Sequence, residues 1–377
     1  MSLARENIDR MEGYTPGEQP TDPDVIKLNT NENPYPPSPR VDECLAGIRG
    51  ADLRRYPPAA ADEFRVFAAG HHGVRPENII RTNGGDELLR LAITTFVNPG
   101  QMIAFMKPSY SLYQELAHIQ DCIPVQIPMA FDWGRPDNLK MQLATCKAKM
   151  CLLVNPHAPS GRLVDADYFY DIAKDYPGIL VIDEAYVDFI DPSVSYDSIA
   201  LVNELDNVLL LRTMSKGYSL AGLRFGYGIG SEALLDPMTR KTRDSYNTDF
   251  ISQKLALAAL GDQEYAKANW AKVRKTRGRL IEALRDIGLR TLESHSNFVL
   301  TFLPTVELAQ MVYQRLKDEH GIYVRYWDAY RLRETLRITV GTDEENEALI
   351  KAFHAILDGV SLEEPRLSEM REIDYNY

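Results

Sequence analysis

The stretch LLLRTMSKGYSLAGLRFGYGIG, residues 209–230, brings an apolar strand directly up to chemically capable side chains. Thr213, Ser215 and Lys216 follow the leucines at once, and Arg224 comes in the glycine-punctuated segment behind them. The lysine either merely decorates the end of a strand or is held there as a nucleophile that can form a Schiff base with an aldehyde. The two hydroxyls and the guanidinium are suited to holding an anion such as a phosphate.

Other predicted strands also end in polar groups. Asn155 and His157 close one apolar run, and Asp183 and Tyr186 close another. A further short strand runs into the Gly84–Gly85 turn, which opens a helix and so presents backbone N–H groups and a positive dipole end to an anion. Because ligands of doubly wound sheets bind beyond the carboxyl ends of the strands, these groups are expected to meet at one site.

Each of these features has an ordinary structural explanation when it is taken alone. Asp183 could cap a helix, Lys216 could lie on the surface, and Gly84–Gly85 could be only a tight turn. Several such strand ends in one chain make coincidence a weaker explanation. A buried aspartate can keep a pyridine nitrogen protonated, so that the ring draws electrons from a bound amino acid. A phosphate cradle, a Schiff-base lysine and a pyridinium partner together specify pyridoxal 5′-phosphate.

These polar strand ends need a sheet to position them, and the apolar pattern predicts one. Short, nearly continuous apolar runs lie in MCLLV, GILVID, NVLLL and RFGYGIG, while QMIAFMK and CIPVQIP are also strand-like. Helical stretches separate most of these runs. The pattern therefore predicts an α/β protein with a largely parallel sheet that is buried on both faces.

The C-terminal part of the chain predicts a smaller α+β unit. SNFVLTFL and residues 336–341 are strand-like, and a helix is expected from about Val306 to His320. A last helix, Asp343 to Leu357, has Thr342 as its cap and acidic residues in its first turn. Residues 13–40 are rich in Pro, Gly, Asn and Asp, which predicts an extended arm.

Composition limits the class of protein. The chain has 377 residues and a net charge of −12, which argues against sequence-independent nucleic-acid binding. The cysteines show no metal-ligand spacing and are expected to be free thiols in a reducing compartment. The N-terminus lacks the apolar segment of a secretory signal, and no run is long enough to span a membrane. We therefore expect a cytoplasmic protein without metal, nucleic-acid or membrane partners.

The chain resembles the fold-type I pyridoxal-phosphate aminotransferases and, more closely, the histidinol-phosphate aminotransferases. The resemblance runs almost end to end, and the S-K-x-x-x-x-x-G-x-R core is a strong signal for the superfamily. LNTNENP near the start and LRITVGT near the end indicate the subfamily. The matching stretches are GYTPG, LNTNENPYPPSP, RRYPP, TNGGDELL, KPSYSLY, VIDEAYVDF, RTMSKGYSLAGLRFGY and LRITVGTDEEN.

The resemblance implies an aspartate-aminotransferase-like fold, in which a mainly parallel seven-stranded sheet lies between helices in a large domain. It implies an N-terminal arm at residues 1–30, associated with the small domain and the partner subunit. The large cofactor-binding domain is expected at residues 31–280 and the small α+β domain at residues 281–377.

The resemblance also implies a role for each polar group at the predicted cofactor site. Lys216 is implied to be the Schiff-base lysine, and Asp183 the partner of the pyridinium nitrogen. Tyr186 is implied to bond the phenolate oxygen of the ring, and Tyr110 to stack on the ring. The implied phosphate contacts are the main-chain N–H groups of Gly85 and Asp86 and the side chains of Thr213, Ser215 and Arg224.

Further residues are implied to reach the site from elsewhere. Tyr56 is implied to contact the cofactor phosphate of the neighbouring subunit, which implies an obligate homodimer with shared active sites. Arg337 is implied to hold the anionic end of the substrate, with Arg325 as its helper. Tyr14 and Asn31 are implied to line the substrate pocket from the N-terminal arm.

One position departs from the family's pattern. The usual P-N-N-P-T-G has a second Asn that bonds the phenolate oxygen of the cofactor, whereas residues 156–161 here read PHAPSG. Ala158 stands at that place and cannot donate a hydrogen bond. We expect His157 to take over this bond through a ring nitrogen. Asn155 could do so after a small backbone shift, and His157 would then be merely structural.

The activity implied by the resemblance is that of a histidinol-phosphate:2-oxoglutarate aminotransferase of histidine biosynthesis. An aromatic amino-acid aminotransferase could share every cofactor residue and differ only near Tyr14 and Tyr110. A threonine-phosphate-type decarboxylase would differ in how the substrate carboxylate is oriented. A non-catalytic cofactor-binding or nucleotide-binding protein is a third alternative, against which the set of Lys216, Asp183 and Arg224 counts.

Overall fold

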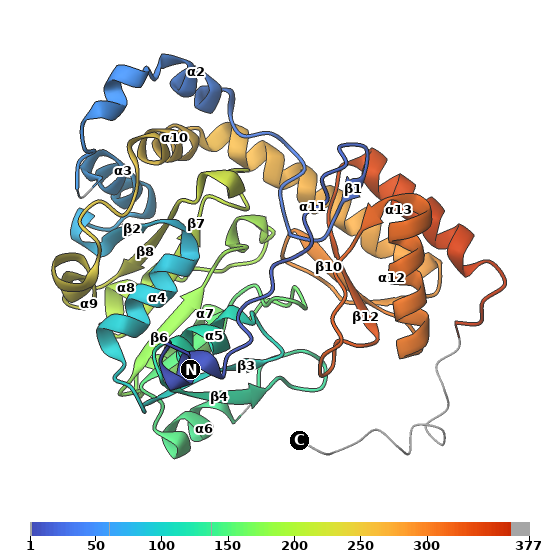
Figure 1. Cartoon of the computed structure of the whole chain (residues 1–377), viewed down its shortest axis with the longest axis horizontal. Coiled ribbons are helices and arrows are strands. Elements are labelled where there is room, and N and C mark those ends of the chain that lie inside the picture. The colour runs from blue at the N-terminus through green and yellow to red at the C-terminus, as the bar shows by residue number, and fades with distance from the viewer. Residues whose placement is uncertain (1, 60, 137, 363–377) are drawn as a thin grey trace.

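The computed structural model describes residues 2–59, 61–136 and 138–362, and Figure 1 shows a larger and a smaller part. The strands are β1 Ile26–Lys27, β2 Ile79–Thr82, β3 Met102–Lys107, β4 Ile123–Pro128, β5 Met150–Val154, β6 Ile179–Asp183, β7 Val208–Thr213, β8 Gly226–Gly230, β9 Arg290–Thr291, β10 Phe298–Phe302, β11 Ile322–Tyr323 and β12 Thr335–Thr339. The α-helices are α1 Glu6–Asp9, α2 Pro39–Gly47, α3 Asp62–His72, α4 Gly84–Phe96, α5 Leu112–Ile119, α6 Leu139–Cys146, α7 Ala166–Ala173, α8 Ile199–Glu204, α9 Glu232–Pro237, α10 Phe250–Leu260, α11 Gln263–Asp286, α12 Val306–His320 and α13 Asp343–Leu357.

The larger part is built on a seven-stranded sheet with the order β2-β8-β7-β6-β5-β3-β4. The pairs from β4 across to β7 are parallel, whereas β8 is antiparallel to both β7 and β2. Every residue of β5, β6 and β8 is buried, so both faces of the sheet are covered there. The α/β class and the largely parallel sheet predicted from the apolar runs are confirmed.

The antiparallel placement of β8 follows from its connection. Parallel neighbours need a crossover, usually an α-helix, whereas residues 214–225 join β7 to β8 without an α-helix. Because β7 and β8 run in opposite directions, the segment between them turns at the carboxyl end of β7. Lys216 and Arg224 both lie on this segment, at the edge where the parallel strands end.

The smaller part combines the antiparallel sheet β12-β10-β9 with α12 and α13. The predicted helix limits at both α12 and α13 are confirmed, and the Thr342 side chain accepts a hydrogen bond from the Glu345 N–H as the expected cap. β12 spans Thr335–Thr339, which begins and ends earlier than the sequence suggested. The long helix α11 connects the two parts (Figure 1).

The N-terminal arm runs between the two parts. Its short strand β1 pairs in parallel with β11 of the smaller part. Between α1 and α2, β1 is the only regular helix or strand of the described arm, in line with the extended conformation expected for residues 13–40. Helix α2 begins at Pro39, because Ser38 accepts a hydrogen bond from the Arg40 N–H and Pro occupies the first turn.

All four cysteines are free thiols, as expected: Cys122 and Cys151 are buried, and Cys44 and Cys146 are partly exposed. Within the described ranges, no helix combines the length and the apolarity that are needed to cross a membrane.

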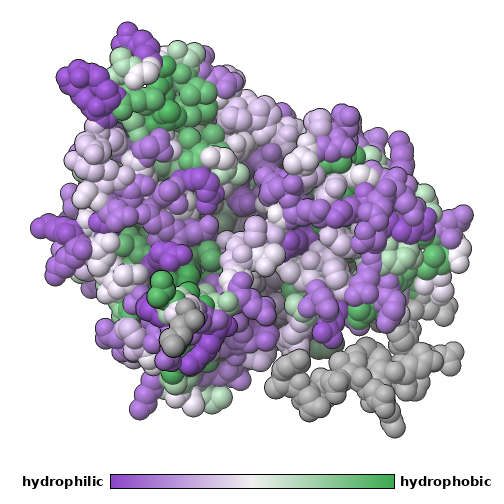
Figure 2. Space-filling view, viewed as in Figure 1, coloured by the Kyte–Doolittle hydropathy of each residue, from purple (hydrophilic) through white to green (hydrophobic). Residues whose placement is uncertain are grey.

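Figure 2 shows an apolar surface over α2 and its surroundings, at the upper left of the view. Exposed apolar side chains of this region are Leu45, Leu53, Tyr56, Val66 and Phe67.

Candidate active site

The amine of Lys216 lies at the carboxyl end of β7 and faces the N-terminal arm. Its Nζ donates a hydrogen bond of 2.9 Å to the Thr30 carbonyl oxygen. The main chain beside it is also held, because Asn33 Nδ2 donates to the Lys216 carbonyl oxygen at 3.2 Å and Trp270 Nε1 donates to the Gly217 carbonyl oxygen at 2.7 Å. Burial lowers the pKa of Lys216 to about 8, so a substantial neutral fraction exists near that pH. Such an amine can act as a nucleophile and as a base.

A buried carboxylate ends the neighbouring strand β6. Asp183 Oδ2 accepts a hydrogen bond of 2.8 Å from the Tyr113 hydroxyl, and Oδ1 accepts one of 3.1 Å from the Ala185 N–H. Burial raises the pKa of Asp183 to about 6, while these two bonds act in the opposite direction. Each oxygen keeps a free lone pair, so the group can accept a further N–H from a cation placed beside it.

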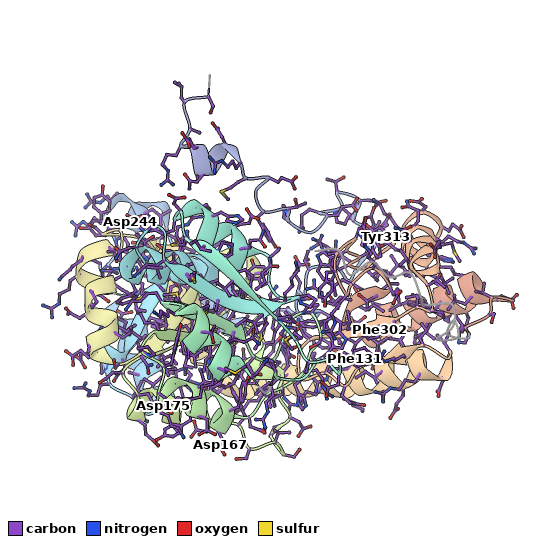
Figure 3. All side chains as sticks on the ribbon, turned by 90° about the horizontal axis from the view of Figure 1, so that it is seen from below. Phe131, Asp167, Asp175, Asp244, Phe302 and Tyr313 are labelled. Atoms are coloured by element: carbon purple, nitrogen blue, oxygen red, sulfur yellow. The ribbon has the colours of Figure 1, made fainter. Side chains whose placement is uncertain are left out.

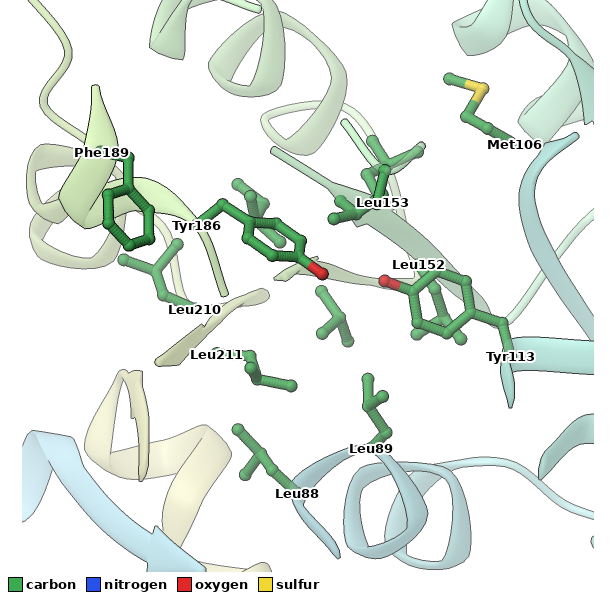
Figure 4. Close-up of a cluster of buried hydrophobic side chains, with 14 of the residues drawn as sticks. Leu88, Leu89, Met106, Tyr113, Leu152, Leu153, Tyr186, Phe189, Leu210 and Leu211 are labelled. Atoms are coloured by element: carbon green, nitrogen blue, oxygen red, sulfur yellow. The ribbon is translucent and has the colours of Figure 1, made fainter. Parts of the chain in front are cut away.

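Two tyrosine hydroxyls point toward each other across a floor of leucines (Figure 4). One belongs to Tyr113, and the other to Tyr186, which accepts a hydrogen bond of 2.9 Å from Asn31 Nδ2. Burial raises the pKa of Tyr186, so its hydroxyl stays protonated and can donate to an oxygen anion. Tyr113 was not singled out from the sequence, although it lies in the quoted stretch KPSYSLY. Its position on a helix face gave no signal that it reaches Asp183.

An anion cradle lies at the N-terminus of α4. Gly84 has a φ of +77°, and a Cβ at this position would lie 2.8 Å from Arg224 Nη2. Glycine therefore lets the guanidinium approach the first turn of the helix. Arg224 Nη2 forms an ion pair of 3.3 Å with Asp86 Oδ2, and the Tyr110 hydroxyl donates to Asp86 Oδ1 at 3.2 Å. Gly85, Asp86, Tyr110 and Arg224 thus lie together at the N-terminus of α4.

Two hydroxyls extend this cradle from the end of β7. Thr213 Oγ1 donates to Ser215 Oγ at 3.0 Å and accepts from the Ser215 N–H at 3.1 Å. This local turn fixes both hydroxyls on the same segment as Lys216 and Arg224. Helix N–H groups, two hydroxyls and a guanidinium are the donors that a phosphate monoester takes, so the residues present fit the phosphate of pyridoxal 5′-phosphate.

A second cationic site comes from the smaller part. Arg337 Nη2 donates to the Asn29 carbonyl oxygen at 2.8 Å, and Arg337 Nε is buried without a partner among the described atoms. Arg325 lies beside it, since their backbones exchange hydrogen bonds of 3.0 and 2.9 Å. Burial and, to a smaller extent, the charge of Arg325 lower the pKa of Arg337 to about 10. Because two guanidinium groups lie side by side and Arg337 Nε has no partner among the described atoms, an anion is the expected partner of this pair.

The arm lies between the two cationic regions and carries Tyr14 and Asn31, which were expected to line the substrate pocket. Residues 29–31 bond Arg337, Lys216 and Tyr186 in turn. The Tyr14 ring meets the Tyr110 ring edge-on, with 5.9 Å between the ring centroids. The arm therefore forms one wall of a single site that both parts of the molecule share.

Tyr56 stands apart from this site. The residue is 80% exposed, and its ring stacks on that of Tyr246 with 4.4 Å between centroids. The contacts found for it among the described residues do not include the groups around Lys216. An aromatic ring held out on the surface in this way is available to a second molecule.

His157 and Asn155 both direct their polar atoms into the protein. The His157 Nε2–H donates to the Pro108 carbonyl oxygen at 3.1 Å, which leaves Nδ1 to accept from the Ser160 hydroxyl at 2.8 Å. Asn155 pairs with the main chain of Val164 through both ends of its amide, at 2.9 and 3.0 Å. This geometry favours the structural role of His157 over the expected cofactor contact, because its one N–H is already in use.

We predict that His157→Ala lowers the free energy of unfolding by about 1–3 kcal/mol, because the Ser160 hydroxyl and the Pro108 carbonyl lose their partner. The pH dependence of the cofactor's visible absorption should stay unchanged. Thermal unfolding and absorption titration of the cofactor-loaded protein measure the two effects. Ser160→Ala, which removes only one of the two bonds, should give a smaller loss. A His157→Ala protein that keeps its stability but shows an altered absorption titration would instead support the expected contact between His157 and the cofactor.

A site with these donors, on a sheet of this topology, defines an enzyme that works on amines through a bound aldehyde cofactor. The family model of the class I and II aminotransferases matches residues 23–353, and the chain belongs to this family. The family predicted from the sequence motifs is confirmed.

Individual relatives give a finer comparison. The chain is 41% identical over 352 residues to a histidinol-phosphate aminotransferase of Rippkaea orientalis, covering 93% of this chain and 98% of the relative. It is 40% identical over 354 residues to one of Geotalea daltonii, covering 94% and 99%. The crystal structure of histidinol-phosphate aminotransferase from Sinorhizobium meliloti in complex with pyridoxal-5′-phosphate superimposes with a TM-score of 0.87, at 25% identity and 96% and 99% coverage.

A more distant structure bears on the fold alone. Aspartate aminotransferase from Thermus thermophilus with maleate superimposes with a TM-score of 0.75 at 20% identity, covering 89% of this chain and 92% of that one. The aspartate-aminotransferase-like fold expected from the sequence is therefore confirmed.

Proposed function

We propose that this aminotransferase uses pyridoxal 5′-phosphate to move the amino group between histidinol phosphate and 2-oxoglutarate, as part of histidine biosynthesis. One observation carries the proposal: Asn29 and Thr30, which are neighbours in the arm, accept hydrogen bonds from the Arg337 guanidinium and from the Lys216 amine. An anion-binding arginine therefore lies close to the reactive amine, as a small phosphorylated amine requires. The names of the relatives at about 40% identity support the same substrate.

The cofactor is proposed to be held by its phosphate, its ring nitrogen and its ring oxygen. Bound pyridoxal 5′-phosphate supplies an aldehyde that condenses with primary amines and a ring that withdraws electrons from the carbon next to the amine. Asp183 holds a proton at the ring nitrogen, and Tyr186 donates to the ring oxygen. Tyr110 is proposed to cover the ring face. The proposed phosphate contacts are the N–H groups of Gly85 and Asp86 and the side chains of Thr213, Ser215 and Arg224.

Lys216 is proposed to move the proton on which the reaction depends. Its Nζ removes the proton from the substrate Cα in one direction and returns a proton to Cα in the other. A pKa near 8 suits both roles, because the amine can exist in either protonation state near neutral pH. The Thr30 carbonyl oxygen accepts a hydrogen bond from this amine and so orients it when no substrate is bound.

Arg337 and Arg325 are proposed to let one site serve two substrates. A guanidinium holds a phosphate or a carboxylate with the same fork of N–H groups. The phosphate of histidinol phosphate and the side-chain carboxylate of glutamate can therefore bind alternately to the Arg337–Arg325 pair. Asn31 and Tyr14 line the proposed pocket from the arm, at the side of Tyr186 and Tyr110.

We also propose a homodimer in which Tyr56 reaches the cofactor phosphate of a second copy. The exposed apolar side chains around α2 and α3, including Leu53 and Phe67, would be covered by that copy. Such an arrangement explains why Tyr56 is exposed here and stacked on Tyr246. We propose a division into an arm at residues 1–30, a large domain at 31–280 and a small domain at 281–377. We also propose that the protein is cytoplasmic.

Half-reactions test the proposed substrate. The protein loaded with pyridoxal 5′-phosphate is mixed separately with histidinol phosphate, glutamate, phenylalanine and threonine phosphate, and the visible absorption is followed. Histidinol phosphate and glutamate should both discharge the absorption band. A faster reaction with phenylalanine would favour the aromatic aminotransferase, and release of carbon dioxide from threonine phosphate would favour the decarboxylase.

A further inference from the structure

Trp327 lies between the two arginines of the anion site. The Arg337 guanidinium carbon is 5.0 Å from the centroid of the Trp327 ring, and the Arg325 guanidinium carbon is 5.1 Å from it. Both distances are within the roughly 6 Å over which a cation is attracted to an aromatic face. One indole therefore contacts both guanidinium groups that are proposed to hold the substrate.

The contacts continue as an alternating column of rings and cations. Arg337 also lies 5.2 Å from the ring centroid of Phe298, and the Phe298 ring meets the Tyr186 ring edge-on at 5.0 Å. The order is thus Tyr186, Phe298, Arg337, Trp327 and Arg325. This column connects the residue proposed to bond the cofactor ring with the residues proposed to bond the substrate anion.

The two arginines need this aromatic support because two positive charges lie close together and no carboxylate of the described residues is paired with either of them. No salt bridge joins Arg325 or Arg337 to an acid among the described residues. A buried guanidinium beside a second one is costly unless negative potential faces it. The faces of Phe298 and Trp327 supply that potential and leave the remaining N–H groups free for an anion.

Trp327 also has apolar neighbours. Trp327 packs against the cluster of Trp133, Leu300 and Leu332, in which Trp133 comes from the loop after β4. Arg331 holds that loop by donating to the carbonyl oxygens of residues 129, 130 and 131 at 2.9 to 3.0 Å. Figure 3 labels Phe131 on this loop and Phe302 at the end of β10, where the larger part meets the smaller one.

We propose that Trp327 is a positioning residue for substrate binding, which sets the spacing and direction of Arg325 and Arg337 so that both bond one anion. The proposal rests on the proposed function, because it assigns the arginines to the anionic end of the substrate. Trp327 acts through the arginines and takes no part in the chemistry at Lys216.

The test measures anion binding and catalysis separately. Inorganic phosphate is titrated calorimetrically into the cofactor-loaded protein, whose cofactor phosphate cradle is already filled. Trp327→Leu should weaken phosphate binding by about tenfold, the size expected for losing the cation–π contacts to both arginines. The KM for histidinol phosphate should rise by a similar factor while kcat changes much less. Trp327→Phe, which keeps an aromatic face, should recover most of the affinity.

Trp133→Leu is the matched control. Trp133 is an indole of the same cluster, and its ring lies 4.6 Å from the guanidinium carbon of Arg331, but it has no contact with the substrate arginines among the described ring and cation pairs. This variant should lower the thermal stability and leave the phosphate affinity within about twofold. Equal phosphate binding by Trp327→Leu and the parent protein would overturn the proposal, as would equal weakening by the two leucine variants.

Arg337→Leu separates this proposal from the proposed function. Loss of phosphate binding in Arg337→Leu locates the anion at the arginine pair, whatever the natural substrate is. If the parent protein does not turn over histidinol phosphate but Trp327→Leu still weakens phosphate binding, the proposed substrate is wrong and the role of Trp327 stands. A cofactor-loaded parent protein that binds no phosphate would overturn the role of Trp327 along with the anion site.

Discussion

Lys216→Ala is expected to abolish aminotransferase activity and to remove the visible absorption band of the cofactor-loaded protein. The lysine amine is proposed as the nucleophile that bonds the cofactor aldehyde and as the base that acts at the substrate Cα, so its removal should end both functions. The loss of rate should be at least about a thousandfold, in the range that removal of a general base produces. Absorption spectroscopy and a half-reaction with histidinol phosphate measure the two effects.

Two further variants separate chemistry from folding. Lys216→Arg keeps a cation at the end of β7 but cannot bond the aldehyde, so it should be as inactive as the alanine variant while its unfolding temperature stays close to that of the parent. Lys107 also ends a strand of the same sheet, where its Nζ lies 5.8 Å from the centroid of the Tyr330 ring. Lys107→Ala should keep the absorption band. An unchanged spectrum in Lys216→Ala would refute the assignment of Lys216.

The sequence predicted the parts of the site that local patterns control. Apolar runs bounded by Gly and polar residues located β5, β6 and β7, and their carboxyl ends placed Asp183 and Lys216 at one edge of the sheet. Capping chemistry located α13, because Thr342 and Glu345 exchange hydrogen bonds that can be read from their spacing. These features depend on neighbours a few residues apart along the chain.

The contacts that the sequence could not predict join distant segments. Asn31 bonds Tyr186 across 155 residues, and Tyr113 bonds Asp183 across 70. The partners of His157 were equally hidden, since Pro108 lies 49 residues away. Trp327 gave no signal either, because an isolated tryptophan beside a charged residue fits an ordinary core position. Such pairings depend on packing between elements, which hydrophobic period and turn residues do not determine.

The arm links the groups with which the two parts of the molecule are proposed to act on one substrate. Consecutive residues 29, 30 and 31 bond Arg337, Lys216 and Tyr186, so one short segment spans the anion site, the reactive amine and the ring-oxygen site. A shift of the smaller part would therefore move the arginine relative to Lys216 only by straining this segment. In the proposed mechanism, the backbone of this segment therefore helps to set the distance between the substrate anion and the reacting carbon.

Asp183→Asn is expected to lower kcat by about a thousandfold while the visible absorption band persists. An amide cannot carry the negative charge that is proposed to keep the ring nitrogen protonated, so electron withdrawal from the substrate Cα should be lost. Lys216 and the phosphate cradle are untouched, and the cofactor should stay bound. The buried position strengthens the expected effect, because a charge pair removed from water contributes more than an exposed one.

Tyr113→Phe provides the graded comparison for this variant. It removes the 2.8 Å hydrogen bond to Asp183 Oδ2 but keeps the carboxylate, whose Oδ1 still accepts from the Ala185 N–H. Loss of one such bond corresponds to about 1–2 kcal/mol, so kcat should fall by about tenfold or less. If Asp183→Asn and Tyr113→Phe lose activity equally, orientation rather than charge is what Asp183 contributes, and its assignment as the pyridinium partner fails.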